Sequence, residues 1–185
     1  MLLKDKVQEC IDQGQPIRLH LGCGPVKLDG YLNVDGEYCA NDTDIVIHDI
    51  SEAYPIPDNS VDEILSVHVI EHIERWKILP MLIEWHRVLK PGAQAAIEWP
   101  DLLKACKFIA ADPESLISED RRVLKKTIHS IFGNSRYQHR AMMHAYGYSI
   151  ASLSKILTEA GFNNVKSENN IYAKTASDSR VIGIK

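Results

Sequence analysis

Hydrophobic positions along this chain alternate between short, continuously apolar runs and longer stretches with helical spacing. Short apolar runs that end in turn residues are typical of buried strands, and spacings of three and four residues are typical of amphipathic helices. The last helical stretch is the clearest, because Ile150, Leu153, Ile156 and Leu157 share one face and Gly161 follows as a stop signal. Strands that alternate with helices predict a parallel α/β sheet.

The pattern assigns an element to most of the 185 residues. It predicts strands at 17–21, 31–34, 43–47, 61–67, 93–98, 162–168 and 180–184. It predicts helices at 2–13, 76–89, 102–111, 114–131 and 149–159. The length suggests a single domain. Residues 101–148, which we call the cap, join a strand to the last helix at the ligand edge of the sheet, so we expect a helical, partly mobile cover there.

Composition excludes several classes of protein. A chain that is 45% hydrophobic and 25% charged is typical of a globular protein, and its apolar runs are far too short to cross a membrane. A net charge of −4 argues against a general nucleic-acid binder, so we expect neither DNA nor a membrane as partner. The start of the chain turns charged at once, which predicts no signal peptide and a cytoplasmic location. The four cysteines are scattered and are expected to be free thiols: Cys10, Cys23, Cys39 and Cys106.

The charge is unevenly distributed. Between residues 102 and 148 there are eight Lys or Arg and four acids, a net +4, which leaves −8 for the rest of the chain. Arg136, His139, Arg140 and His144 fall within nine residues of this segment. We therefore expect Arg136, His139 and Arg140 to bind an anionic group of a small molecule. The plainer interpretation is a set of solvated surface charges.

The most informative chemistry lies at residues 19–35. The strand 17–21 leads into Gly22-Cys23-Gly24, where two residues without a Cβ allow a tight turn and a close approach of the backbone to a ligand. Asp35 closes the next strand, and a carboxylate in that position can accept hydrogen bonds from both hydroxyls of a ribose. The pattern favours a nucleoside site, although an ordinary turn could also hold two glycines.

Further segments strengthen this interpretation. In chain order, the informative segments are His20–Gly24, Asn33–Asp35, Tyr54–Ile64, Val69–Ile73, Arg87–Gly92 and Leu153–Phe162. Together they resemble the class I S-adenosylmethionine-dependent methyltransferases, in particular the small type 11 group. The resemblance covers nearly the whole chain and implies one α/β domain with a Rossmann-like seven-stranded sheet. That sheet would be mostly parallel with an antiparallel last strand, and would carry helices on both faces.

The resemblance also implies S-adenosylmethionine as the cofactor and suggests which residues hold it. The backbone of Gly22 to Gly24 would lie against the methionine and ribose portions of the cofactor. Asp35 would accept hydrogen bonds from the ribose hydroxyls, and His68 would face the methionine end. Asp49 and Ile50 would meet the adenine, although Asp49 could instead cap a turn. The implied cofactor residues are therefore His20, Gly22, Cys23, Gly24, Asp35, Asp49, Ile50 and His68.

Two departures from the family pattern stand out. His20 occupies the position where the family usually has an acid before the first glycine. Only ten residues separate Gly24 from Asp35, fewer than the dozen or so that a full crossover helix with its turns needs. We therefore expect the first helix to be short or absent.

Methyl transfer from a sulfonium needs positioning and desolvation more than a fixed catalytic set. The reaction predicted is O- or N-methylation of a small acceptor bearing a carboxylate or phosphate, such as a sugar derivative. Candidate bases lie where the strands end. We favour His72, Asp101 and His144, with His139 and Tyr146 as further candidates. Each could equally be a hydrogen-bonded surface residue.

Three other functions stay open. His68 to His72 spells H-x-x-E-H, a zinc-peptidase motif, but the β-like run before His68 denies it the helical spacing, so we expect no metal. A nicotinamide enzyme would have a third glycine where Lys27 stands. The third is a protein that keeps the fold and cofactor but binds a partner without catalysis, which His20 and the short connection keep possible.

Overall fold

The computed structural model describes residues 2–36, 42–134 and 136–185. Its strands are β1 (Arg18–Leu21), β2 (Leu32–Asp35), β3 (Val46–Ile47), β4 (Val61–Val67), β5 (Leu89–Pro100), β6 (Asn163–Glu168) and β7 (Asp178–Ile184). Its α-helices are α1 (Leu3–Asp12), α2 (Arg75–Val88), α3 (Leu102–Ala111), α4 (Arg121–Lys126), α5 (Ile128–Phe132) and α6 (Ile150–Glu159). Three 3-10 helices complete the set: η2 (Ile70–His72), η3 (Pro113–Ile117) and η4 (Arg140–Met142).

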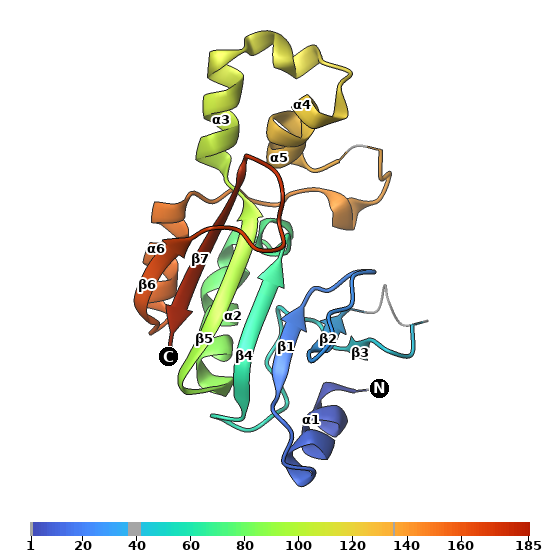
Figure 1. The fold of residues 1–185 in the computed structure, drawn as a ribbon, viewed down its shortest axis with the longest axis vertical. Helices are drawn as coiled ribbons and strands as arrows, with labels where there is room; N and C mark the ends of the chain where they lie inside the picture. Colours follow the sequence, from blue (N-terminus) through green and yellow to red (C-terminus); the bar gives the residue numbers. More distant parts are fainter. Residues whose placement is uncertain (1, 37–41, 135) are drawn as a thin grey trace.

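The seven strands form one sheet in the order β3-β2-β1-β4-β5-β7-β6 (Figure 1). β1 to β5 pair in parallel, and β7 pairs antiparallel with both β5 and β6. The predicted fold class is therefore confirmed. The order reverses between β1 and β4, and in sheets of this kind ligands bind outside the carboxyl ends of the strands at such a point.

Most of the core lies on one face of the sheet. Helices α1, α2 and α6 bury their apolar faces there, with α1 beside β3, α2 beside β5, and α6 beside β6 and β7. Trp85 of α2 is fully buried, and its indole N–H donates to the Tyr54 hydroxyl at 3.0 Å. The buried contacts from these helices are Leu3, Val7, Ile78, Trp85, Leu153 and Leu157.

The opposite face lacks the first crossover helix, as the ten-residue spacing predicts. The structure shows no helix between Cys23 and Tyr31. Leu28 and Tyr31 of this connection pack instead on a small cluster formed by Leu65, Ala96 and Ile182.

A loop between β6 and β7 covers more of that opposite face, and Figure 1 shows it crossing in front of β5 toward the end of β4. Glu98 of β5 anchors the loop, because its carboxylate accepts from the backbone N–H groups of Ile171, Tyr172 and Ala173 at 2.5 to 3.0 Å. Arg180 donates to the same carboxylate at 2.7 Å, and both side chains are buried. The anchor fixes the loop beside the carboxyl ends of β4 and β5.

The cap extends beyond the carboxyl end of β5, with α3, α4 and α5 at the top of Figure 1. The predicted single helix at 114–131 is wrong, since the chain forms η3, α4 and α5 there. Asp120 caps the start of α4 by accepting from Arg122 N at 2.8 Å, and a capping side chain favours a helix start. Thr127 breaks the helix again, with φ −122° and ψ −106°.

Smaller differences concern strand ends and cysteines. The strand predicted at 43–47 shrinks to β3, since residues 43 and 44 form a turn, and the strand predicted at 93–98 is extended in both directions. Cys10 and Cys106 are free thiols, as expected, while Cys39 lies outside the described residues. Within the described ranges, no helix has the length and apolar character needed to cross a membrane.

Candidate functional site

The glycine turn after β1 has the strained geometry that its sequence predicts. Gly22 and Gly24 have φ angles of +68° and +52°, a region that side chains with a Cβ rarely adopt. The backbone N–H groups of Gly22 and Cys23 both donate to Val34 O, which ties the turn to β2. A Cβ on Gly22 would overlap the side chain of Val69, whereas one on Gly24 would meet nothing within 4 Å. Gly24 therefore leaves room for a ligand against the backbone.

Asp35 ends β2 next to this turn. Its Oδ2 accepts from Gly24 N at 2.6 Å, and its Oδ1 accepts from Gly36 N at 2.7 Å. The side chain stays partly exposed. Because a carboxylate has about four lone-pair sites, two remain for the hydroxyls of a ribose.

A cavity of about 970 Å³ lies beside Gly24. It is walled by the glycine turn, by the chain leading into β3 and by the cap, through Gly24, Pro25, Thr43, Ile45, Arg136, His139 and Met142. Its volume and its place at the strand ends suit a nucleoside cofactor. The open Gly24 and the acceptor lone pairs of Asp35 fit S-adenosylmethionine at this edge.

Two of the predicted cofactor residues, His20 and Cys23, have buried side chains. His20 is buried, and its Nδ1 lies 3.1 Å from Asn33 Oδ1. Burial lowers the pKa of His20, so the ring is neutral near pH 7. Its side chain therefore supports β2 rather than replacing the family's acid. Cys23 is buried in the turn, with its Sγ 3.5 Å from Gly24 O.

Asp49 and Ile50 follow β3 as predicted, but the structure gives Asp49 a local role. Its Oδ1 accepts from both the backbone N–H and the hydroxyl of Ser51, at 2.9 and 2.8 Å, which is an Asx turn. Asp49 is exposed and Ile50 is buried below it. The turn-capping alternative is thus present, and a contact of these residues with adenine stays a prediction.

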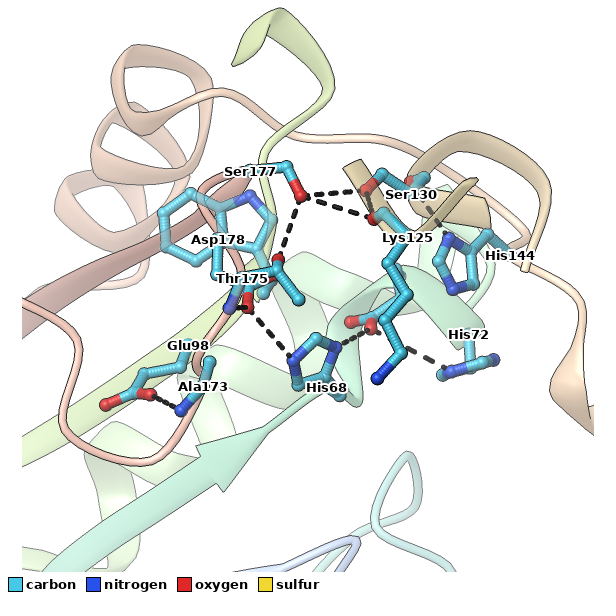
Figure 2. A network of polar contacts seen from close by, with 12 residues as sticks. His68, His72, Glu98, Lys125, Ser130, His144, Ala173, Thr175, Ser177 and Asp178 are labelled. Atoms are coloured by element: carbon cyan, nitrogen blue, oxygen red, sulfur yellow. Dashed lines mark hydrogen bonds and ion pairs between the residues drawn. The ribbon is translucent and has the colours of Figure 1, made fainter. Parts of the chain in front are cut away.

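A second cavity, of about 450 Å³, lies between the sheet edge, the cap and the β6–β7 loop. Figure 2 shows His68, His72 and His144 around this space, with the side chain of Lys125 extending toward them. Its walls include His68, Glu71, His72, Lys125, His129, Met142, His144, Lys174 and Asp178. Met142 also lines the cavity beside Gly24, so the two cavities share a wall.

His68 leaves the end of β4 with a φ angle of +55°, uncommon for a residue with a side chain. Its Nδ1 lies 3.4 Å from Glu71 Oε1 and its Nε2 lies 3.7 Å from Asp178 Oδ2. Although burial alone would lower the pKa of His68, Asp178 and Glu71 raise it to about 10. His68 is therefore a cation at neutral pH that faces the second cavity.

Glu71 and His72 sit in η2 and meet His144 from the cap. Ala145 N and Tyr146 N donate to Glu71 O at 2.6 and 3.1 Å, which clamps the cap onto η2. The rings of His72 and His144 lie 4.9 Å apart, edge to face. β4 runs through Val67 and η2 begins at Ile70, so residues 64–75 form no peptidase helix.

Asp101 holds the start of α3. Its Oδ1 accepts from Leu103 N and Lys104 N at 2.9 and 3.2 Å, and its Oδ2 accepts from Ser179 Oγ at 2.9 Å. The side chain is buried and outside the walls of the second cavity. This arrangement favours a helix cap over a catalytic base.

Of the residues predicted to bind an anion together, His139 shares one cavity with Arg136 and another with Arg140. Arg136 and His139 line the cavity beside Gly24, and Arg140 lines neither that cavity nor the one at His68. A common anion site of the three stays a prediction. Sequence reasoning also missed Lys125, Met142 and Asp178, since only the fold brings them to His68.

Comparison with known proteins supports the geometry. The family described as "Methyltransferase domain" matches residues 29–97. No curated protein sequence matches the chain significantly.

Solved structures match nearly the whole chain. A SAM-dependent methyltransferase from Archaeoglobus fulgidus is 18% identical, with a TM-score of 0.62, covering 99% of this chain and 93% of that one. A SAM-dependent methyltransferase from Methanosarcina mazei is 15% identical, with a TM-score of 0.60, covering 100% and 99%. A possible histamine N-methyltransferase from Thermotoga maritima is 15% identical, with a TM-score of 0.54, covering 97% and 87%.

At these identities the solved structures show the shared fold, and the family match adds the methyltransferase assignment for residues 29–97. Gly24 and Asp35 provide the edge at which S-adenosylmethionine fits. Residues 29–97 therefore match a methyltransferase domain, and the chain as a whole has the fold of S-adenosylmethionine-dependent methyltransferases.

Proposed function

We propose that this methyltransferase modifies an oxygen or nitrogen of a small acceptor that bears a carboxylate or phosphate and binds in the cavity at His68. The observation that carries the proposal is that Met142 lines both this cavity and the one beside Gly24, so the two cavities are adjacent. A methyl donor in one cavity and an acceptor in the other would meet there, as in-line transfer requires.

The cofactor side rests on Gly24 and Asp35. The open position at Gly24 admits the donor against the backbone, and Asp35 accepts from its ribose hydroxyls. Arg136 lies on the same cavity, where a guanidinium can pair with a carboxylate. We therefore place Arg136 with the cofactor, instead of with the acceptor.

The acceptor side carries positive groups from three parts of the chain. Lys125 of α4, Lys174 of the β6–β7 loop and the cationic His68 all line the cavity. Three such groups can hold one carboxylate or phosphate, but not the many charges of a nucleic acid. A small anion, such as a sugar acid or sugar phosphate, suits this set.

When bound, S-adenosylmethionine supplies the activated methyl group, and the acceptor atom gives up a proton as it gains the methyl. The protein's part is to align the acceptor atom and exclude water. Of the predicted bases, His72 and His144 line the acceptor cavity. They are the residues we expect to contact the acceptor atom, and Asp101 is not.

The test is transfer of a labelled methyl group from S-adenosylmethionine to a panel of small carboxylates and phosphates. We expect labelled product from at least one class of anion, with a KM that rises about tenfold or more in Lys125→Ala. Lys107→Ala is the matched control, because Lys107 lies outside this cavity. Cofactor binding without transfer to any acceptor would favour the non-catalytic alternative.

A further inference from the structure

The fold brings the buried Glu71, which has no role in the proposed methyl transfer, against His72 and His144. One ligand atom from each lies within 4.8 Å of the others. Two come from η2 and the third from the cap, and the clamp of Ala145 N and Tyr146 N on Glu71 O holds them together. The cluster is therefore built by the tertiary fold, from residues more than 70 positions apart in the chain.

Both imidazoles are oriented by the backbone. His72 Nδ1 lies 3.0 Å from Met143 O, and His144 Nδ1 lies 3.1 Å from Ser130 O. A carbonyl oxygen only accepts, so each Nδ1 carries a proton and each neutral ring keeps a lone pair on Nε2. Histidines that bind a metal are oriented by the same kind of second hydrogen bond.

The carboxylate of Glu71 is buried and lacks hydrogen bonds. Its side chain is 2% exposed, and neither oxygen has a hydrogen-bond partner among the described residues. Its polar neighbours, His68 Nδ1 and His72 Nε2, stand at ion-pair distances of 3.4 and 3.9 Å. A buried carboxylate is costly unless a cation and hydrogen bonds compensate it.

His68 alone does not supply that compensation. It also faces Asp178, whose Oδ1 is buried without a hydrogen-bond partner in the described structure. His68 thus lies at ion-pair distance from two buried carboxylates, those of Glu71 and Asp178. Lys125 and Lys174 line the cavity but are exposed. A cation bound at Glu71 would supply the partner that both of its carboxylate oxygens lack among the described residues.

We propose that Glu71, His72 and His144 bind a first-row divalent metal ion of the zinc type. Two imidazole nitrogens and one carboxylate oxygen suit such an ion better than magnesium or calcium, which prefer oxygen ligands alone. Zinc at about 2.0–2.1 Å from its ligands needs them roughly 3.4 Å apart, so small side-chain rotations complete the site. The H-x-x-E-H segment would thus contribute Glu71 and His72, with His144 in place of His68.

Three protein ligands leave a coordination position open toward the cavity at His68, as in catalytic zinc sites. An oxygen or nitrogen of the acceptor could occupy it. That role rests on the proposed function, whereas metal binding itself does not. Failure of the two ideas can therefore be told apart.

The experiment titrates untagged, chelator-treated protein with Zn²⁺ and, separately, with Co²⁺. We expect one equivalent per chain by calorimetry, a Co²⁺ visible spectrum of a nitrogen- and oxygen-ligated ion, and a rise in the unfolding temperature with metal. His72→Gln and His144→Gln should each weaken binding at least about tenfold, since even outer groups of metal sites have effects of that size.

His129→Gln is the matched control, because His129 lines the same cavity outside the cluster. It should bind metal as the wild type does, and circular dichroism should show that all three variants fold. Absence of a bound equivalent, or equal affinity in the wild type and His144→Gln, would overturn the site. Intact S-adenosylmethionine binding in that case would leave the proposed function standing.

Discussion

The contacts of Asp35 could be predicted from the spacing of residues in the sequence, whereas those of Glu71 could not. Asp35 was recognisable because an acid ends the strand after a glycine turn, and the structure places it against Gly24 N. Glu71 was visible only inside a motif whose helical reading is wrong. Its neighbour His144 lies 73 positions away in the chain, and no local sequence pattern predicts that the two come together.

Asp35→Ala should weaken S-adenosylmethionine binding by about 1–3 kcal/mol, because ribose hydroxyls would lose their acceptor. Asp35→Asn keeps one oxygen for Gly24 N and should lie between the wild type and the alanine variant. Calorimetry gives the three affinities. Unchanged affinity in Asp35→Ala would remove Asp35 from the cofactor site.

Alanine variants of Arg136 and Arg140 test whether the positive charge of the cap binds the cofactor or forms one anion site for the acceptor. Arg136→Ala should lower cofactor affinity about tenfold and leave acceptor binding unchanged, because Arg136 lines the cavity beside Gly24. Arg140→Ala should change neither. Both constants come from the same labelled-methyl assay. A raised acceptor KM in Arg140→Ala would restore the clustered anion site expected from sequence.

Elements were predicted best where packing and periodicity agree. Helix α6 and the strands β4 and β7 match their patterns because each buries a continuous apolar face. The cap was predicted less well, since its short helices bury few residues and end at capping side chains such as Asp120. Continuous helical spacing over 114–131 carried no information about those breaks.

Variants of Asp101 test whether its carboxylate caps α3 or acts as a catalytic base. Asp101→Ala should cost about 0.5–2 kcal/mol of stability, because two backbone N–H groups lose their acceptor. Asp101→Asn keeps an oxygen for the cap and should retain both stability and methyl transfer. Loss of transfer in a stable Asp101→Asn protein would show a catalytic carboxylate.

The loop between β6 and β7 depends on an ionised Glu98. Burial alone would raise the pKa of Glu98, but three backbone N–H donors and Arg180 hold it below its usual value. A carboxylate with a lowered folded-state pKa stabilises the fold above its unfolded-state pKa, and this stability is lost as pH falls through the folded value. Wild-type stability should therefore fall on acidification.

Glu98→Gln should flatten that acid dependence and cost about 3–5 kcal/mol at neutral pH, because Arg180 would stay buried without its partner. Urea unfolding across a pH series measures both effects. Glu159→Gln, in an exposed pair with Lys155, is the control and should change stability by no more than about 1 kcal/mol. An equal loss in the two variants would contradict the role of Glu98 as the loop's anchor.

At the scale of the whole molecule, the seven-stranded sheet, its antiparallel last strand and the position of the ligand edge were predictable, because several ordered segments constrain one topology. The meeting of two cavities at Met142 was not, since it depends on how the cap folds over the sheet. Under the proposed function, the fold would set where methyl donor and acceptor meet, and the residues of the cap would select the acceptor.

The most direct test of this account is calorimetric titration of the wild-type chain with S-adenosylmethionine and, in parallel, with a nicotinamide dinucleotide. The account predicts one equivalent of S-adenosylmethionine per chain and no binding of the dinucleotide, because Lys27 replaces the third glycine that a dinucleotide site needs. Absence of S-adenosylmethionine binding, or tighter binding of the dinucleotide, would contradict it.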